Sequence, residues 1–566
     1  MKFSQIPYTR VELAPTKAQA EALTAALTAA TDYATAKAVF AQWQTLSSAI
    51  TTASSLAMVR HTIDTNDDFY NAEKDYYDEA SPIFQEMEQD FSKALLTSPY
   101  RADFEQEFGV LFIKNAEIAL GIFSPAIIAD LQEENRVESE YVKLMASAQI
   151  DFQGQQLTLS QLTPYMQSQD RDTRLAAWAA NGSFFDQHKE AWDSLYDKLT
   201  AIRTKIGRTL GHENFIPTGY DRMVRNSYTE ADVDKFRQGV RDYIVPVAAR
   251  LKQEQAQRIG VDYPMLYSDD PVLFAGGNAA PFGTPEEIMA HGQKMYHEMS
   301  AESGAFIDFM VQNELFDILS RKGKAGGGYC TTFPDYNCPF IFANFNGTAH
   351  DVEVITHEAG HAFAEYVARD IYPRENRNPT LESCEIHSMS MEFFAWPWCE
   401  GFFGKDTQKF YYQHLAGALT FLPYGTMVDH FQHEIYKNPD MTPAQRHEVW
   451  AELEKIYRPW IKDSDTTFYR EGRYWQRQHH IYEMPFYYID YCLAQTVALQ
   501  FWAAMQADRT DAWKRYMHLL SQAGTMTFDQ LVACADMASP FGGTALKDVA
   551  DTALAWLDGF DRTALI

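Results

Sequence analysis

Two histidines four residues apart, with a glutamate directly after the first, form the motif in this sequence whose chemistry is easiest to identify. They are His357, Glu358 and His361. On an α-helix, residues four apart share a face, so both imidazoles can hold one metal ion. Glu358 lies about 100° around the axis and can reach a water on the metal without being a ligand. This H-E-x-x-H arrangement is typical of zinc hydrolases, in which zinc lowers the pKa of the water and the glutamate accepts its proton.

A catalytic zinc site of this kind needs a third protein ligand and an open position for water. Four residues between positions 380 and 394 are candidates by type: Glu382, Glu385, His387 and Glu392. Glu385 and Glu392 are seven apart on one helix face, so one can bind the metal while the other supports a histidine. A solvated acidic face is the alternative, but the hydrophobic residues around them predict a buried helix, where carboxylates need partners. We expect His387 to be a core histidine. Spacing alone leaves the third ligand open.

An aromatic segment from His479 to Tyr491 contains two histidines and four tyrosines. A tyrosine hydroxyl can donate a hydrogen bond to the oxyanion that develops when water attacks a peptide carbonyl. Tyr488 and Tyr491 are three apart and therefore neighbours on a helix face. Because 14% of the residues are aromatic, spacing alone favours core packing for this segment.

A glycine run followed by β-prone residues comes just before the metal motif, from Lys322 to Thr348. We interpret it as a small sheet whose last strand, 339–345, presents an exposed edge beside the metal. Such an edge binds an extended peptide by main-chain hydrogen bonds. Glycines there allow the backbone to approach closely or to move as a flap. A plain surface hairpin is the alternative. The substrate-binding candidates are Phe342, Ala343, Asn344, Gly327 and Gly328.

Most of the remaining chain has a helical pattern, with threonine caps before proline or acidic residues. The expected helix starts are at Thr163, Thr229, Thr284 and Thr442. Thr348 and Asp351 fit a capping box, so a helix that carries both histidines is expected to begin there. The segment 150–159 is typical of a short β-hairpin that turns at Gly154. A capped helix after a strand is the context that the metal motif requires, which disfavours a helix with two histidines and no metal.

Several segments together carry a resemblance to a known family. They are HEAGHAF and EIHSMSMEFF around the metal motif, GGGYCTTFPDYNCPFIFANFNGT before it, HHIYEMPFYYIDYCLAQ at 479–495 and RHTIDTNDDFYNAEKDYYDEASP at 60–82. The combination resembles the oligoendopeptidase F branch of the thimet-oligopeptidase family of zinc peptidases, over most of the chain.

The resemblance implies roles for individual residues. It makes Glu385 the third zinc ligand, and it assigns a histidine and tyrosines of the aromatic segment to catalysis. The family pattern has one histidine before the Ile-Tyr/Phe pair, which indicates His480 rather than His479. The residues chosen are His480, Tyr488 and Tyr491, with Tyr482 as a further candidate.

Charge and composition limit the partners. The 566 residues include 48 Lys and Arg against 77 Asp and Glu, a net charge of −29. We therefore expect no nucleic-acid partner and no membrane partner, because both need a positive surface. The six cysteines form no C-x-x-C pair, and the first residues contain no apolar run. We expect a cytoplasmic protein without a disulfide framework.

These observations predict a mainly α fold, a large helical body with a small β-sheet next to the H-E-x-x-H helix. We expect an N-terminal helical region at 1–200, a catalytic region at 201–566 and, from the resemblance, a deep substrate cavity. The expected activity is zinc-dependent hydrolysis of internal bonds in short peptides, with one zinc ion and Glu358 as general base. The alternatives are a helical zinc carboxypeptidase and a zinc-containing peptide-binding protein without turnover.

Overall fold

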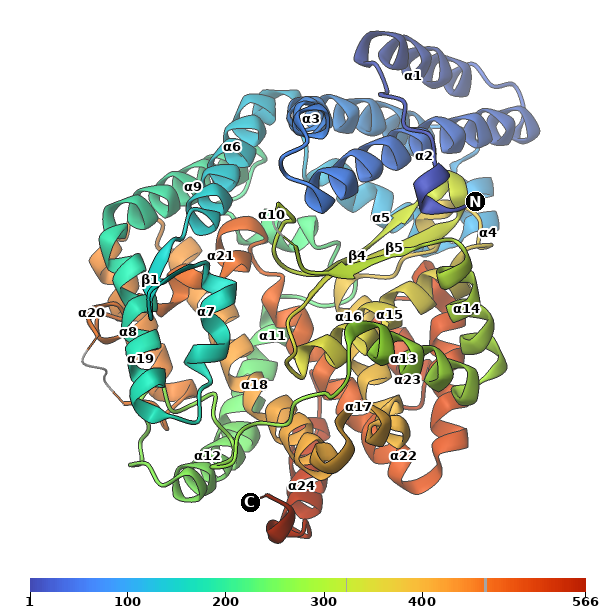
Figure 1. The fold of residues 1–566 in the computed structure, drawn as a ribbon. Helices are drawn as coiled ribbons and strands as arrows, with labels where there is room; N and C mark the ends of the chain where they lie inside the picture. Colours follow the sequence, from blue (N-terminus) through green and yellow to red (C-terminus); the bar gives the residue numbers. More distant parts are fainter. Residues whose placement is uncertain (322, 463–465, 566) are drawn as a thin grey trace.

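Helices make up most of the chain, as the sequence predicts (Figure 1). The computed structural model describes residues 1–321, 323–462 and 466–565, so Lys322, the first residue of the expected sheet segment, lies outside the described residues. Within the described residues, no single helix is long and apolar enough to cross a membrane. One bent pair, Val110–Gly121 with Pro125–Ala146, meets the length and composition requirements together.

The N-terminal helices pack around a hydrophobic cluster of their own, formed by side chains between positions 20 and 113. Their bounds are α1 Leu13–Thr28, α2 Tyr33–Ile63, α3 Asp68–Leu96, α4 Arg101–Phe108 and α5 Val110–Gly121. The larger core cluster draws side chains from both sides of residue 200. The boundary expected there stays a prediction.

The chain continues through further helices, of which those up to residue 209 lie along one side of the molecule (Figure 1). These are α6 Ile128–Ala146, α7 Leu159–Met166, α8 Arg171–Gln187, α9 Lys189–Thr209, α10 Ile216–Arg222, α11 Glu230–Gly239 and α12 Val245–Ile259. The expected hairpin forms between β1, Ile150–Phe152, and β2, Gln155–Leu157. It turns at Gly154, whose φ of 78° suits glycine.

Three of the four expected helix starts are confirmed. Thr284 and Thr442 form capping boxes at α13, Pro285–Met299, and α19, Pro443–Tyr457, and Thr229 precedes α11. The start at Thr163 is wrong. Helix α7 begins four residues earlier, because Thr158 forms a capping box with Gln161 and the helix continues through Pro164.

The small sheet contains three strands in the order β3-β5-β4. Their bounds are β3 Phe316–Leu319, β4 Tyr329–Phe333 and β5 Cys338–Phe345. Strand β5 is parallel to β3 and antiparallel to β4. The expected edge strand is therefore wrong: β5, which carries Phe342 and Ala343, is central, and both side chains are fully buried. The edges of the described sheet belong to β3 and β4.

The metal-motif helix is α15, His350–Ala368, and it starts differently from the expected capping box. Its N-cap residue is Ala349. The Asp351 carboxylate instead accepts hydrogen bonds from the backbone N–H groups of Asn346 and Gly347, each at 2.8 Å. Asp351 thus closes the turn between β5 and α15 and sets the angle at which the helix leaves the sheet.

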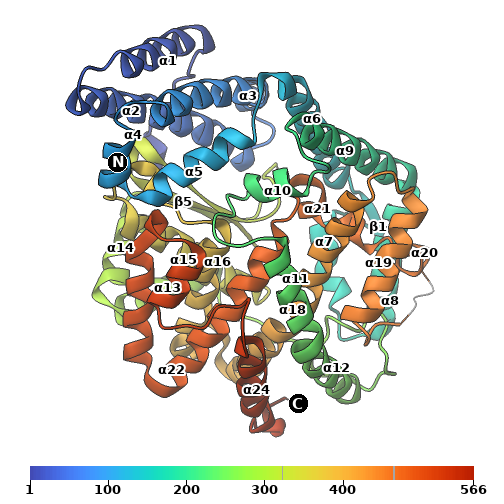
Figure 2. The ribbon, with the colours of Figure 1, turned by 180° about the vertical axis from the view of Figure 1, so that it is seen from behind.

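Helices of the C-terminal part lie below the sheet, and the N-terminal helices lie above it, in both views (Figures 1 and 2). The remaining helices are α14 Ala301–Gln312, α16 Leu381–Phe394, α17 Glu400–Phe403, α18 Thr407–Lys437, α20 Thr467–Arg470, α21 His479–Glu483, α22 Tyr488–Gln522, α23 Phe528–Cys534 and α24 Ala545–Asp558. Helix α16 packs against both α15 and α22.

The two helices of the metal motif approach each other closely at Gly360. A Cβ atom at that position would lie 2.7 Å from the Ser388 Cα and 2.8 Å from the His387 carbonyl oxygen.

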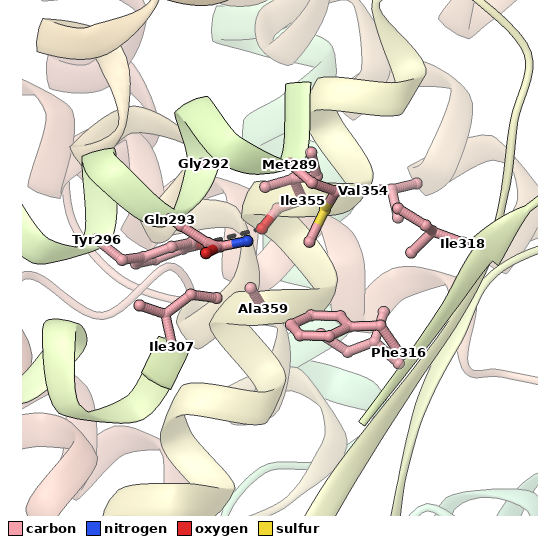
Figure 3. A pocket seen from close by; sticks show the side chains of 11 residues that line it. Met289, Gly292, Gln293, Tyr296, Ile307, Phe316, Ile318, Val354, Ile355 and Ala359 are labelled. Carbon is pink, nitrogen blue, oxygen red and sulfur yellow. Dashed lines mark hydrogen bonds between the residues drawn. The ribbon is translucent and has the colours of Figure 1, made fainter. Parts of the chain in front are cut away.

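The opposite side of α15 packs on α13 and β3 around an apolar cavity of about 10 Å³ (Figure 3). There the Tyr296 hydroxyl donates to the Ile355 carbonyl at 3.0 Å. This cavity is too small and too apolar for a peptide, and it lies behind the metal-binding face.

Candidate metal centre

Helices α15 and α16 bring together two imidazoles and one carboxylate. The Oε2 atom of Glu385 lies 3.3 Å from Nε2 of His357 and 3.4 Å from Nε2 of His361. The donor atoms of all three residues lie within 4.8 Å of one another. Two histidines and a glutamate with one open position are the donor set of catalytic zinc sites. The residues present therefore fit a zinc ion.

Burial differs across this donor set. The Glu385 side chain is 3% exposed, whereas those of His357 and His361 are 22% and 19% exposed. The site is therefore closed on the side of α16 and accessible on the other. Burial would lower the pKa of His357, but hydrogen bonds with Glu385 and Glu392 outweigh it and raise that pKa well above its ordinary value. The surroundings favour positive charge at this position.

Glu382, a candidate by spacing, faces away from the histidines. Its Oε1 accepts a hydrogen bond from the Thr380 hydroxyl at 2.5 Å. Burial and the neighbouring Asp490 carboxylate raise the pKa of Glu382 to about 8. A carboxyl that is neutral at pH 7 is a poor metal ligand. His387 is also buried, on the core side of α16.

Glu392 supports the metal-binding histidine, as the seven-residue spacing allows. Its two carboxylate oxygens contact His357 Nδ1 at 2.7 Å and His414 Nε2 at 2.8 Å. Trp396 Nε1–H donates to His414 Nδ1 at 2.8 Å, so His414 carries its proton on Nε2 and donates to Glu392. Burial would raise the pKa of Glu392, but the two histidine hydrogen bonds lower it to about 2. The resulting anion accepts Nδ1–H of His357 and leaves Nε2 free for the metal.

Two hydroxyl groups orient the Glu385 carboxylate. The Ser388 hydroxyl donates to Oε2 at 2.8 Å, and the Tyr487 hydroxyl donates to Oε1 at 2.5 Å. Sequence reasoning missed Tyr487, although it belongs to the aromatic segment. It missed His414 entirely, because that histidine lies on α18 and has no spacing relationship to the motif.

Glu358 lies beside the glycine run. It is half-buried, and in the described part of the chain its carboxylate makes no hydrogen bond or ion pair. A Cβ atom at Gly328 would lie 3.8 Å from Glu358 Oε1 and 3.4 Å from the Phe342 carbonyl oxygen. Both are ordinary van der Waals distances, and they show that the loop passes beside the carboxylate that is expected to act as the base.

The base of that loop is held firmly, and its tip is exposed. Asn344 Nδ2 donates to the carbonyl oxygens of Ala325 and Gly327 at 2.8 and 2.9 Å, so Asn344 supports the loop. Lys324 Nζ is buried and binds Asp317 Oδ1 at 2.6 Å. Gly327 itself is exposed, with φ +89°.

His480 and Tyr491 are direct neighbours in the site. His480 Nε2 lies 3.3 Å from the Tyr491 hydroxyl. The Tyr488 ring lies 4.9 Å from the His480 ring. Tyr491 also packs on Tyr487, at 4.9 Å between ring centroids, and Tyr487 binds Glu385. Burial and the negative charge of Glu385 raise the pKa of Tyr491, which keeps its hydroxyl protonated.

The other two candidates in this segment lie elsewhere. The Tyr482 hydroxyl donates to the Trp192 carbonyl at 3.3 Å, and its ring stacks on Tyr141 at 3.9 Å, inside the core. His479 Nδ1 contacts Glu483 at 2.9 Å. Only His480 of the two histidines contacts Tyr491.

A short hydrogen-bond chain determines the tautomer of His480. The Tyr424 hydroxyl donates to Gln478 Oε1 at 2.8 Å, which leaves the Gln478 amide N–H facing His480 Nδ1 at 2.9 Å. Because Nδ1 accepts, neutral His480 carries its proton on Nε2. Burial lowers the pKa of His480 to about 4. His480 is therefore a neutral N–H donor directed toward Tyr491.

Two adjoining cavities of about 640 and 520 Å³ extend along this face. The first begins at the start of α15, at His350 and Glu353. The second, referred to below as the arginine cavity, is bordered by Arg477 and His479. Both cavities share Gln167 and Pro271 in their linings. Their combined size suits an extended peptide segment.

The chain matches two family models. Residues 3–123 match the peptidase M3 N-terminal domain, and residues 287–548 match peptidase family M3. A search of curated proteins gave no match.

Three solved structures are similar over the full length. One, named oligoendopeptidase F, has 46% sequence identity and a TM-score of 0.97, with 100% of each chain covered. PZ peptidase A with an inhibitor has 43% identity and a TM-score of 0.96, covering 99% of this chain and 100% of the other. A structure from Bacillus anthracis, also named oligoendopeptidase F, has 42% identity and a TM-score of 0.93, covering 100% of this chain and 99% of the other.

Proposed function

The chain belongs to peptidase family M3, and on that basis we propose that it is an endopeptidase that uses one zinc ion to hydrolyse internal bonds of short peptides. The observation that carries the proposal is the convergence of His357, His361 and Glu385 within 4.8 Å, with Glu358 on the same helix. Zinc held by these donors supplies a Lewis acid that acidifies water and polarises the peptide carbonyl.

Glu358 acts as the general base. It follows a metal-binding histidine directly, and the described residues offer its carboxylate no competing hydrogen bond. It accepts a proton from the attacking water and later delivers it to the leaving amine. Gly328 of the glycine loop lies beside this carboxylate without placing a side chain on it.

Hydrogen-bond donors opposite Glu358 stabilise the negative charge that develops on the carbonyl oxygen. His480 carries its proton on Nε2, and Tyr491 remains a protonated phenol next to it. Tyr488 is the third candidate donor. Donors fixed in place before the reaction stabilise the transition state without reorganisation, and each is worth several kcal/mol.

The edge of β4 is the candidate surface for the peptide main chain. Strand β4 contacts α15, and burial together with the Glu358 carboxylate raises the pKa of the Cys330 thiol on this strand. Among the described strands β4 pairs only with β5, so its other edge pairs with no strand. Main-chain pairing there binds an extended peptide with little demand on its sequence.

The test is digestion of an internally quenched peptide that is blocked at both ends, with products identified by mass. Internal cleavage by the zinc-loaded enzyme is expected, and the Glu358→Gln variant serves as the matched inactive control. Activity only on peptides with free C-termini would favour the carboxypeptidase alternative. Binding without cleavage would favour the peptide-binding alternative.

A further inference from the structure

The arginine cavity contains a cation that has no carboxylate partner among the described residues. Arg477 is exposed to this cavity, and its guanidinium contacts only the phenol hydroxyl and ring of Tyr474, with 4.8 Å from the guanidinium carbon to the ring centroid. Tyrosine offers it no negative charge at neutral pH. The chain has 29 more acidic than basic residues, yet this guanidinium contacts no carboxylate among the described residues.

The other charged groups in the lining are already paired. Arg458 contacts Asp270 at 3.0 Å and Glu454 at 2.8 Å, and Asp270 also contacts Lys252 at 2.8 Å. His479 is paired with Glu483. Arg477 therefore gives this part of the wall an uncompensated positive charge. A planar guanidinium with free N–H groups binds a carboxylate in bidentate fashion.

A series of aromatic ring contacts runs from Arg477 to the reaction site. The Tyr488 ring lies 4.9 Å from His480 and 5.9 Å from Tyr424, and the Tyr424 ring lies 6.4 Å from Tyr474. Tyr474 in turn contacts Arg477. An extended peptide advances about 3.3 Å per residue, so about seven residues span this path at most. Arg477 is within reach of a short substrate whose scissile bond lies beside His480.

We propose that Arg477 and the wall around Tyr474 form a subsite that binds a carboxylate group of the peptide substrate. The inference rests on the proposed function. The carboxylate is either the C-terminus of a short peptide or an acidic side chain. Trp178, Phe185 and Tyr267 also line the cavity and provide apolar surface for the residue that carries it. The subsite compensates locally for a protein charge that repels anionic peptides.

The experiment compares three peptides with the same cleavable core, quantified by chromatography. One has a free C-terminal carboxylate, one a C-terminal amide, and one a C-terminal amide with a glutamate in place of a glutamine. We expect the wild-type enzyme to cleave one or both carboxylate peptides with a kcat/KM about 10–100-fold above that of the uncharged amide. This factor corresponds to the free energy that a hydrogen bond to a charged group contributes to binding. The peptide whose kcat/KM is raised shows whether the subsite binds the C-terminal carboxylate or the acidic side chain.

Arg477→Gln is expected to remove this preference mainly through KM, while the uncharged amide is cleaved as by the wild type. Arg477→Lys keeps the positive charge but not the bidentate geometry, so we expect it to retain part of the preference for carboxylate peptides. Arg208→Gln is the matched control, because Arg208 is exposed on α9 and, in the described residues, has no carboxylate partner. Zinc content and melting temperature are measured for each variant to confirm folding.

Equal cleavage of all three peptides by the wild type would overturn the subsite, and so would an unchanged preference in folded Arg477→Gln. Either result leaves the proposed function intact, because the amide peptide is still cleaved internally. Absence of internal cleavage for every peptide would instead overturn the proposed function.

Discussion

In the proposed mechanism, turnover depends most directly on Glu358. Glu358→Gln keeps the size and shape of the side chain but cannot accept a proton from water. We expect it to lower kcat by about 10²–10⁴-fold, while zinc content and peptide affinity remain near those of the wild type. Metal analysis, peptide binding and single-turnover rates measure the three quantities. A near-normal rate in a zinc-loaded variant would contradict the general-base assignment.

The tyrosines of the aromatic segment differ in their contacts, and Tyr→Phe substitution separates their roles. Tyr491 contacts His480 through its hydroxyl, so Tyr491→Phe is expected to lower kcat by about 10²–10³-fold with little change in KM. The same measurement on Tyr488→Phe decides whether the second hydroxyl also donates. If both variants stay fully active and lose only thermal stability, the two tyrosines have a packing role.

The neutral state of His480 gives a pH prediction. Burial lowers its pKa to about 4, below the ordinary value of about 6.5 for histidine. The folded protein therefore disfavours protonation: His480 stays neutral above about pH 4, and its contribution to stability is lost as the pH falls from about 6.5 toward 4. Between pH 5 and 8, kcat/KM of His480→Gln is expected to be lower than that of the wild type with the same profile. If the wild-type kcat/KM fell below about pH 6.5 and this fall disappeared in His480→Gln, the assignment of a neutral His480 would be contradicted.

At the scale of single residues, local spacing carries much of the information about the metal centre. The four-residue spacing of His357 and His361 and the seven-residue spacing of Glu385 and Glu392 each place side chains on one helix face. The contacts of His414, Tyr487 and Gln478 are set by how separate helices pack, and helical periodicity does not encode that packing. The family resemblance, which the comparisons confirm, supplied the choice of Glu385 that spacing left open.

At the scale of elements, the close crossing of α15 and α16 fixes the distance between the histidines and Glu385. Gly360→Ala would place a Cβ atom 2.7 Å from the Ser388 Cα, so the helices must separate. We expect a loss of about 1–3 kcal/mol in the free energy of unfolding. Zinc affinity is expected to fall about 10-fold or more, because the donors no longer converge.

Gly417→Ala is the matched control, because a Cβ atom on this residue of α18 meets nothing within 4 Å. It is expected to raise the free energy of unfolding by about 0.5–1 kcal/mol through helix propensity alone. Denaturant unfolding and competitive zinc titration measure both variants. If Gly360→Ala behaved like Gly417→Ala, the helix crossing would tolerate a side chain.

Local sequence signals predict the helices and the hairpin more reliably than they predict the order of the strands in the sheet. Threonine caps located helices α13 and α19, and Gly154 located the hairpin turn. The strand order β3-β5-β4 depends on which strands meet in space. The β propensity of the residues in β5 does not distinguish an edge strand from a central strand. The expected position of Phe342 and Ala343 at an edge is wrong for this reason. Asp351 was misread for a related reason, since its carboxylate binds the preceding turn and not the helix start.

At the scale of the whole molecule, the two cavities are lined by residues from both halves of the chain and adjoin the start of α15 and the residues next to His480. The candidate metal centre lies between α15 and α16, where Glu385 is almost fully buried, and a folded protein cannot present an extended segment there. We therefore expect no cleavage of a stably folded protein under conditions that digest short peptides. Gel analysis of the folded protein, and of the same protein cut into peptides as control, makes the comparison. Efficient digestion of the folded form would indicate an open cleft.

Arg203 on α9 joins distant parts of the chain to the aromatic segment. It is fully buried, it binds Glu134 at 2.7 Å and it contacts the main-chain carbonyl oxygens of Ile481 and Tyr482. These carbonyls directly follow His480 in the chain. Arg203 thereby links Glu134 of α6 to the segment that carries His480.

The contact between Glu385 and Tyr487 has a consequence for the moment at which activity begins. The two residues are 102 positions apart. At roughly 5–20 residues per second, a ribosome needs roughly 5–20 s to pass from one to the other. A growing chain thus acquires its metal donors well before the tyrosines and His480 that complete the site. The order of synthesis therefore places completion of the site near the end of translation.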